Sequence, residues 1–178
     1  MAELTAKAKK IKLVATDIDG VWTDARMYVT PEGEWMKAFS TYDGMATAML
    51  KKKGIIVAIL TGENSDIVIA RAEKLNIDEV YVDEHEKLKR LTYLTKKYDI
   101  SMEEVAFIGD DVNDLEVLGA VGFSAMASNS PILDKFTPDY VTTRPGGNGA
   151  AVERCGHKGH FRYRLLCDIT QCHERACL

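Results

Sequence analysis

Leu13-Val-Ala-Thr-Asp-Ile-Asp-Gly-Val-Trp-Thr-Asp24 is the stretch on which a prediction of this chain's fold and chemistry depends. An apolar run ends there at two aspartates spaced one apart, Asp17 and Asp19, and then at a glycine. This predicts a buried strand that delivers carboxylates to the edge of an open α/β sheet, where such folds bind their ligands. Because side chains alternate along a strand, both carboxylates leave it on the same side. Close carboxylates repel unless a cation or a shared proton compensates, which favours a divalent metal; a strand ending in a solvated acidic turn is the alternative.

The length and charge of the chain narrow its class. Its 178 residues fit one domain with a sizeable core. The net charge is −4 with acids and bases mixed, so no basic tract indicates nucleic acid or an anionic membrane as a partner. No apolar run approaches the ~18 residues of a membrane-spanning helix. The lysine-rich residues 1–10 do not form a secretory signal, so we expect a cytoplasmic location.

Strand and helix patterns alternate along the chain, which predicts an α/β fold with a doubly wound, mostly parallel sheet. Aromatic and β-branched residues around Pro31-Glu-Gly33 predict a β-hairpin flap over about 21–39. Its two tryptophans, Trp22 and Trp35, predict a partner surface. Strands are expected at 11–16, 55–60, 79–82, 105–108, 122–124 and 140–142, and helices from an Asp43 cap to 53, at 65–75, 84–98 and 130–136, with a short one ending near 119.

Four sets of polar residues follow the predicted strand ends: Asp17 with Asp19, then Thr61, then Lys87, then residues 110–114. In a doubly wound sheet those ends share one rim. The rim would hold a carboxylate pair, a hydroxyl, an ammonium and a second acidic cluster, which together suit phosphoryl transfer with a divalent cation. Each set alone is weak evidence, because a threonine after a strand is often a helix cap and a lysine in a charged helix is usually solvated.

The order Asp-x-Asp-Gly, Thr-Gly, Lys and Gly-Asp-Asp-x-x-Asp resembles the haloacid dehalogenase superfamily of phosphohydrolases, over roughly residues 11–153. The resemblance implies that Asp17 is the nucleophile that forms an aspartyl-phosphate. It implies that Asp19 protonates the leaving sugar oxygen and later deprotonates the attacking water. Thr61 and Lys87 would hold the transferring phosphoryl group.

The same resemblance implies a Mg²⁺ site. Its ligands would be Asp17, the backbone carbonyl of Asp19, and Asp110, with Asp111 or Asp114 in support. Mg²⁺ is expected rather than zinc because all of these ligands are oxygens.

Two gaps in the motif order indicate the branch of the superfamily. The segments between Asp19 and Thr61 and between Thr61 and Lys87 leave no room for a cap domain. The aromatic hairpin and a Gly-Gly-x-Gly loop resemble the capless 3-deoxy-D-manno-octulosonate 8-phosphate phosphatases and their relatives that act on nine-carbon sialic-acid-type 9-phosphates. That resemblance implies a homotetramer in which neighbouring hairpins close each site.

The resemblance also bears on the substrate, a 2-keto-3-deoxy sugar acid phosphate. Glu63 after Gly62, with Lys74 one helix later, resembles the type acting on 2-keto-3-deoxynononate or N-acetylneuraminate 9-phosphate. A nine-carbon substrate is therefore expected, and the eight-carbon octulosonate 8-phosphate is the alternative. Glu63 as a helix N-terminal acid favoured by the dipole is the purely structural explanation. The predicted substrate-binding residues are Thr61, Gly62, Glu63, Lys74 and Lys87.

Residues 154–178 depart from the family pattern. We therefore expect a polar extension at 1–10, the phosphatase domain at 11–153 and an atypical tail at 154–178. The cysteines and histidines of the tail are consistent with a small zinc site, although their spacing matches no standard zinc finger. The alternatives are a divergent end and a frame-changed end. The candidate zinc ligands are Cys155, His157, His160, Cys167, Cys172, His173 and Cys177.

Two functions from other classes compete with the enzyme. A phosphoryl-accepting signalling receiver also uses Asp, Thr, Lys and a metal, but its phosphoacceptor follows the third strand and its acidic pair the first. Here the Asp-x-Asp comes first and the Gly-Asp-Asp last, which speaks against a receiver. A non-catalytic assembly module would not need every catalytic position, and all of them are present.

Overall fold

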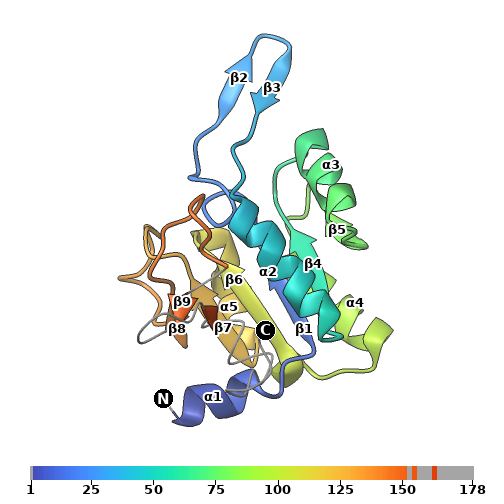
Figure 1. The fold of residues 1–178 in the computed structure, drawn as a ribbon, viewed down its shortest axis with the longest axis vertical. Coiled ribbons are helices and arrows are strands. Elements are labelled where there is room, and N and C mark those ends of the chain that lie inside the picture. Colours follow the sequence, from blue (N-terminus) through green and yellow to red (C-terminus); the bar gives the residue numbers. More distant parts are fainter. Residues whose placement is uncertain (1, 152–153, 156–161, 164–178) are drawn as a thin grey trace.

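The computed structural model describes residues 2–151, 154–155 and 162–163 and confirms the predicted α/β fold. Six strands form one sheet in the order β5-β4-β1-β6-β7-β8, and every neighbouring pair is parallel (Figure 1). Since β1 lies between β4 and β6, segments far apart in sequence meet at the centre of the sheet. The strands are β1 (Leu13–Thr16), β4 (Ile56–Leu60), β5 (Glu79–Tyr81), β6 (Val105–Gly109), β7 (Phe123–Met126) and β8 (Tyr140–Val141).

Helices cover both faces of the sheet, because the central strands are apolar on both sides. Val14 of β1 faces the core under α2 (Thr41–Lys52) and α3 (Asp66–Lys74). Leu13 and Ala15 face the core under α4 (Lys87–Tyr98) and α5 (Leu115–Ala120). This alternation follows from the period of two along a strand. The remaining helical elements are α1 (Ala2–Ala8), η1 (Met102–Glu104) and η2 (Val112–Asp114).

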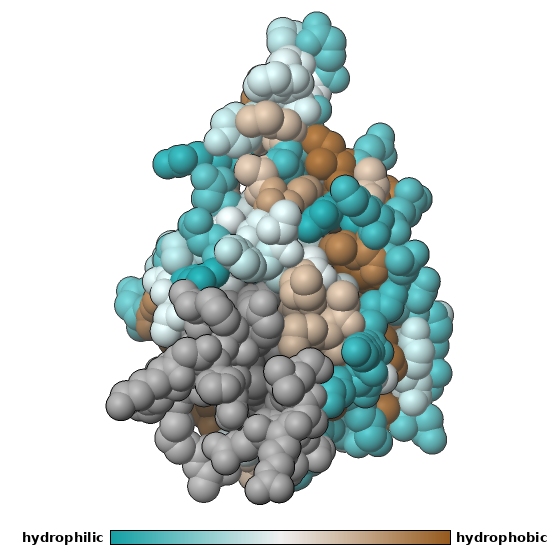
Figure 2. Space-filling model, viewed as in Figure 1, coloured by the Kyte–Doolittle hydropathy of each residue, from teal (hydrophilic) through white to brown (hydrophobic). Residues whose placement is uncertain are grey.

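The predicted hairpin is present as β2 (Tyr28–Thr30) and β3 (Gly33–Met36), and it projects away from the sheet (Figure 1). Its two tryptophans have different environments. Trp35 is 66% exposed, whereas Trp22 is only 2% exposed and packs edge to face on Phe39. The prediction of a surface with two tryptophans was therefore wrong for Trp22. Figure 2 shows apolar residues gathered at the base of the projection.

Two predicted local features differ from the structure. Helix α2 is capped by Ser40, whose hydroxyl accepts from the amide of Tyr42, and Asp43 lies inside the first turn, fully buried. Burial raises the pKa of Asp43 to about 7, against the lowering effect of its hydrogen bond from the Ala151 amide. The helix predicted at 130–136 is instead a run of turns at 131–135. Pro138 disfavours a helical conformation in Thr137, so these turns do not extend into a longer helix.

The ends of the chain contain two further features. Residues 2–8 of the predicted polar extension form α1, whose Ala8 is buried in the core. In the tail, β9 (Arg154–Cys155) pairs antiparallel with β10 (Arg162–Tyr163). The side chains of the candidate zinc ligands lie outside the described residues, so the tail predictions and the domain boundaries remain predictions. No helix within the described ranges has the length and apolarity to cross a membrane.

Candidate active site

The ends of β1 and β6 bring the first and last acidic motifs together. Thr16 pairs with Ile108 across the two strands, and the amide of Asp17 donates to the Ile108 carbonyl at 2.9 Å. Asp17 and Asp110 therefore leave adjacent parallel strands at the same edge. With Asp114 they form a buried group in which one carboxylate oxygen from each residue lies within 4.8 Å of the other two. Carboxylate oxygens in such an arrangement can hold a divalent cation.

Lys87 lies between two of these carboxylates. It is the first residue of α4 and its side chain is 3% exposed. Its ammonium donates to Asp17 Oδ2 at 2.6 Å and to Asp114 Oδ1 at 2.7 Å. Isolated buried ammonium groups are unstable, so these two carboxylates are what allow the lysine to stay charged inside the fold. The predicted meeting of Asp17 and Lys87 is thus present in the geometry.

Asp114, rather than Asp111, supports the predicted metal ligand Asp110. Asp114 is fully buried and its Oδ2 accepts from the amide of Asp110 at 2.9 Å. Asp111 is exposed and its carboxylate accepts from the amide of Val112, at the start of η2. Ser130 Oγ donates to the carbonyl of Asp110 at 2.5 Å, which fixes the backbone after β6.

The ionised carboxylates of the cluster are unfavourable without a bound cation. Burial, followed by the charge of Asp114, raises the pKa of Asp17 to about 6, although Lys87 lowers it. Burial and the neighbouring carboxylates raise the pKa of Asp110 to about 8. Asp110 Oδ1 is buried without a hydrogen-bond partner among the described residues. A Cβ on Gly20, which has a φ of +85°, would overlap the Asp110 carboxylate, so glycine there keeps the oxygens accessible.

Asp19 does not join the group of three carboxylates. Its Oδ1 accepts from Lys37 Nζ at 2.7 Å and from Thr23 Oγ1 at 3.1 Å. Lys37 lies just after β3. Its side chain is 1% exposed, and its ammonium also pairs with Glu34 at 2.9 Å. Burial opposes the charge on Lys37, but its hydrogen bonds to the two carboxylates outweigh burial and raise its pKa. Sequence reasoning missed Lys37, and the only signal was a lone lysine in an otherwise apolar hairpin exit.

The predicted substrate-binding residues fall into two groups. Thr61 is buried directly after β4, and Gly62 follows it at the rim. Glu63 is exposed at the same rim, and its carbonyl accepts from the amide of Asp83 at 3.3 Å. Lys74 is exposed at the last turn of α3, a helix roughly 13 Å long, and so lies at the far end from the rim. Within this one chain, the structure does not bring Lys74 to the carboxylate cluster.

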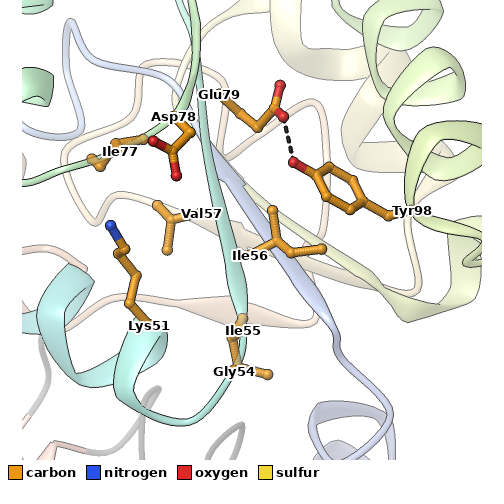
Figure 3. Close-up of a pocket in the computed structure, with 9 residues that line it drawn as sticks. All are labelled: Lys51, Gly54, Ile55, Ile56, Val57, Ile77, Asp78, Glu79 and Tyr98. Atoms are coloured by element: carbon orange, nitrogen blue, oxygen red, sulfur yellow. Dashed lines mark hydrogen bonds between the residues drawn. The ribbon is translucent and has the colours of Figure 1, made fainter.

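A separate cavity lies at the opposite end of the sheet. It has a volume of about 290 Å³ and lies where β4 and β5 begin (Figure 3). Glu79 in its wall accepts hydrogen bonds from the hydroxyls of Tyr81 and Tyr98 and from Lys97. Because its carboxylate is satisfied and none of the motif residues lines the cavity, this cavity is not the candidate active site.

Comparisons with known proteins agree with this geometry. A family model described as haloacid dehalogenase-like hydrolase matches residues 34–122. The 3-deoxy-D-manno-octulosonate 8-phosphate phosphatase KdsC of Escherichia coli (strain K12) is 39% identical over 155 residues, or 86% of this chain and 82% of the relative. The enzyme of that name from Haemophilus influenzae is 37% identical over 147 residues, covering 83% of this chain and 82% of the relative.

Solved structures give the same result. This chain is similar to the octulosonate 8-phosphate phosphatase of Moraxella catarrhalis, a structure in complex with magnesium ion, phosphate ion and KDO. The identity is 41%, the TM-score is 0.81, and the match covers 85% of this chain and 87% of that one. The resemblance predicted from the motifs is thus confirmed. The chain belongs to the haloacid dehalogenase-like hydrolase family.

Proposed function

We propose that this protein is a Mg²⁺-dependent phosphatase that hydrolyses 3-deoxy-D-manno-octulosonate 8-phosphate through an aspartyl-phosphate. The observation that carries the proposal is the buried ammonium of Lys87 between Asp17 and Asp114, beside an oxygen of Asp110 that has no hydrogen-bond partner among the described residues. A phosphate ester bound to this group would meet a nucleophile, a cation and metal ligands together.

The eight-carbon substrate is the alternative weighed from the sequence, and it replaces the expected nine-carbon one. The chain is a phosphoric monoester hydrolase by family, and the named relatives at 37–39% identity are octulosonate 8-phosphate phosphatases. Nothing in these comparisons supports a nine-carbon preference. Glu63 and Lys74, on which that preference rested, are exposed and at opposite ends of α3.

The reaction has two steps, in which the residues of this chain take the following roles. In the first step an oxygen of Asp17 attacks phosphorus, the bond from phosphorus to the sugar oxygen breaks, and Asp19 gives its proton to that oxygen. In the second step Asp19 takes a proton from water, the water oxygen attacks phosphorus, and the bond to Asp17 breaks. Lys87 and Thr61 hold the phosphoryl oxygens throughout.

Mg²⁺ bound by Asp17, the backbone carbonyl of Asp19 and Asp110 would neutralise charge on the phosphoryl group. Asp110 Oδ1, buried and without a partner in the part of the chain that the structure describes, is the observation that fits such an ion. Asp114 supports the site by holding the amide of Asp110 and the ammonium of Lys87.

We further propose that the chain assembles with copies of itself, as a homotetramer, through the hairpin. Met27, Val29 and Trp35 are 54%, 63% and 66% exposed, and such an apolar group on a projecting hairpin is typical of a protein contact. We also propose that the phosphatase domain spans residues 11–153 and that the protein is cytoplasmic.

The proposed function is tested by measuring kcat/KM for the 8-phosphate of the eight-carbon acid and the 9-phosphates of the nine-carbon acids side by side with Mg²⁺. The Asp17→Asn variant serves as the blank, because it keeps the shape of the site and removes the nucleophile. We expect a preference of at least about tenfold for the eight-carbon substrate, a difference of about 1.4 kcal/mol. A preference for either nine-carbon substrate would reject the substrate, and activity in Asp17→Asn would reject the mechanism.

A further inference from the structure

The hairpin is attached to its own active site by a chain of partly buried polar contacts. Lys37 follows β3, and its ammonium donates to Asp19 Oδ1 at 2.7 Å and to Glu34 Oε1 at 2.9 Å. The other oxygen of Glu34 accepts from the hydroxyl of Ser65, the cap of α3. The hairpin therefore contacts the loop after β1 and the helix after β4, on two sides of the site entrance.

These contacts restrain the two oxygens of Asp19 differently. Oδ1 accepts from both Lys37 and Thr23, at 2.7 Å and 3.1 Å. Oδ2 is buried and has no partner in the part of the chain that the structure describes. A carboxylate held at one oxygen by two donors keeps a fixed orientation, and only its second oxygen remains available to a reacting group.

We infer that Lys37 is a positioning residue for Asp19, holding Oδ1 so that Oδ2 is the oxygen that exchanges the proton with the leaving group. The inference rests on the proposed function, in which Asp19 is the acid and base. It assigns the hairpin a task within its own subunit, in addition to any contact with a neighbour. A lysine with a purely structural role would only hold the hairpin against the rest of the protein.

The two roles differ in how they depend on the leaving group. The value of kcat/KM reports the steps up to release of the leaving group, and so excludes hydrolysis of the aspartyl-phosphate. A sugar alkoxide needs a proton to leave, whereas p-nitrophenolate leaves without one. Loss of a correctly placed acid therefore lowers kcat/KM for the sugar phosphate and spares p-nitrophenyl phosphate.

The experiment compares both substrates in Lys37→Met, which keeps an unbranched side chain, one atom shorter than lysine, and removes the charge. We expect kcat/KM for the sugar phosphate to fall about 10- to 100-fold, less than the 10²–10⁴-fold range for losing an acid, with a change below about threefold for p-nitrophenyl phosphate. Asp19→Asn gives the limit of this selective loss. Lys37→Arg, which restores a cation, should recover most of the ratio between the two substrates.

A control separates this loss from the loss of an ion pair in general. Lys12→Met breaks the 2.6 Å pair with Glu104 at the amino end of β1 and should leave the ratio unchanged. If Lys37→Met does not fold, Lys37→Gln, which has a similar length to methionine and is neutral but polar, is expected to give the same selective loss. Equal losses on both substrates in whichever variant folds would overturn the inference. The ratio of kcat/KM values can be measured with any alkyl phosphate that the wild type hydrolyses. An error in the eight-carbon assignment would be seen with the wild-type enzyme alone and would not affect this test.

Discussion

Removing Mg²⁺ should make the free energy of unfolding fall as the pH rises from about 5 to about 8. In the metal-free fold, burial and neighbouring carboxylates raise the pKa of Asp17 from 3.8 to about 6 and that of Asp110 from 3.8 to about 8. Between the unfolded and folded values the folded chain binds more protons than the unfolded chain. Stability is therefore greatest below the unfolded pKa and is lost as the pH rises through the folded values.

The size of the effect follows from these two shifts. One unit of pKa shift corresponds to about 1.4 kcal/mol, so across this pH window Asp110 contributes about 4 kcal/mol and Asp17 about 1 kcal/mol. The two carboxyls repel each other, so they do not titrate independently and about 5 kcal/mol is an upper bound. We expect a measured loss of about 2–5 kcal/mol without metal. A bound cation stabilises both ionised carboxylates, so Mg²⁺ should remove most of this slope.

The assay is urea unfolding followed by circular dichroism at several pH values, with EDTA or with saturating Mg²⁺. Asp43, whose pKa burial raises to about 7, adds a slope of the same sign but lies outside the group of Asp17, Asp110 and Asp114. The measurement is therefore repeated in Asp43→Asn, which can still accept from the Ala151 amide. A metal-free stability that stays level or rises with pH in that variant would refute the reasoning. So would a Mg²⁺ stabilisation of equal size at both ends of the window.

Three further predictions concern single side chains. Lys87→Met leaves its carboxylate partners buried without their cation, so the metal-free fold should lose about 3–5 kcal/mol in urea unfolding, and Mg²⁺ should restore part of this; an unchanged stability would contradict the buried ion pairs. Gly20→Ala should weaken Mg²⁺ binding at least about tenfold by calorimetry, because its Cβ would overlap Asp110. Gly54→Ala is the control: its φ of +77° gives comparable backbone strain of about 1–3 kcal/mol, but a Cβ there has nothing within 4 Å, so Mg²⁺ should bind normally. Trp35→Ser should lower the molar mass in light scattering, and a constant mass would remove this side chain from the proposed contact between copies.

The sheet and most of the cluster were predictable because each signal is local. Apolar runs that end in Asp17, Thr61 and Asp110 predict strands, and parallel strands place their carboxyl ends at one edge. The sequence could not distinguish Asp111 from Asp114, since both follow β6 within a few residues. That distinction depends on the tight turn of η2, which buries Asp114 and leaves Asp111 exposed.

The features that sequence reasoning missed all depend on contacts between irregular segments. Lys37 lies 18 residues from Asp19, and the register of the hairpin shifts at Tyr28/Val29, so no periodicity predicts that the two side chains meet. Trp22 is an aromatic residue in a turn-rich stretch, a pattern that predicts an exposed side chain. In the structure its indole nitrogen donates to Thr16 Oγ1 at 3.0 Å inside the core. Both cases are decided by tertiary packing.

The place of β1 at the centre of the sheet also has a consequence for synthesis of the chain. Strand β1 emerges from the ribosome early, yet one of its two neighbours, β6, follows roughly 90 residues later, an interval of about 5–20 s at ordinary translation rates. Until then its four buried residues have one backbone edge open, although the helices α2, α3 and α4 precede β6 in the chain. The nascent chain should therefore be most prone to aggregation during this interval. Because Asp17 meets Asp110 only when β6 docks, catalytic activity can serve as a reporter that β1 and β6 have paired.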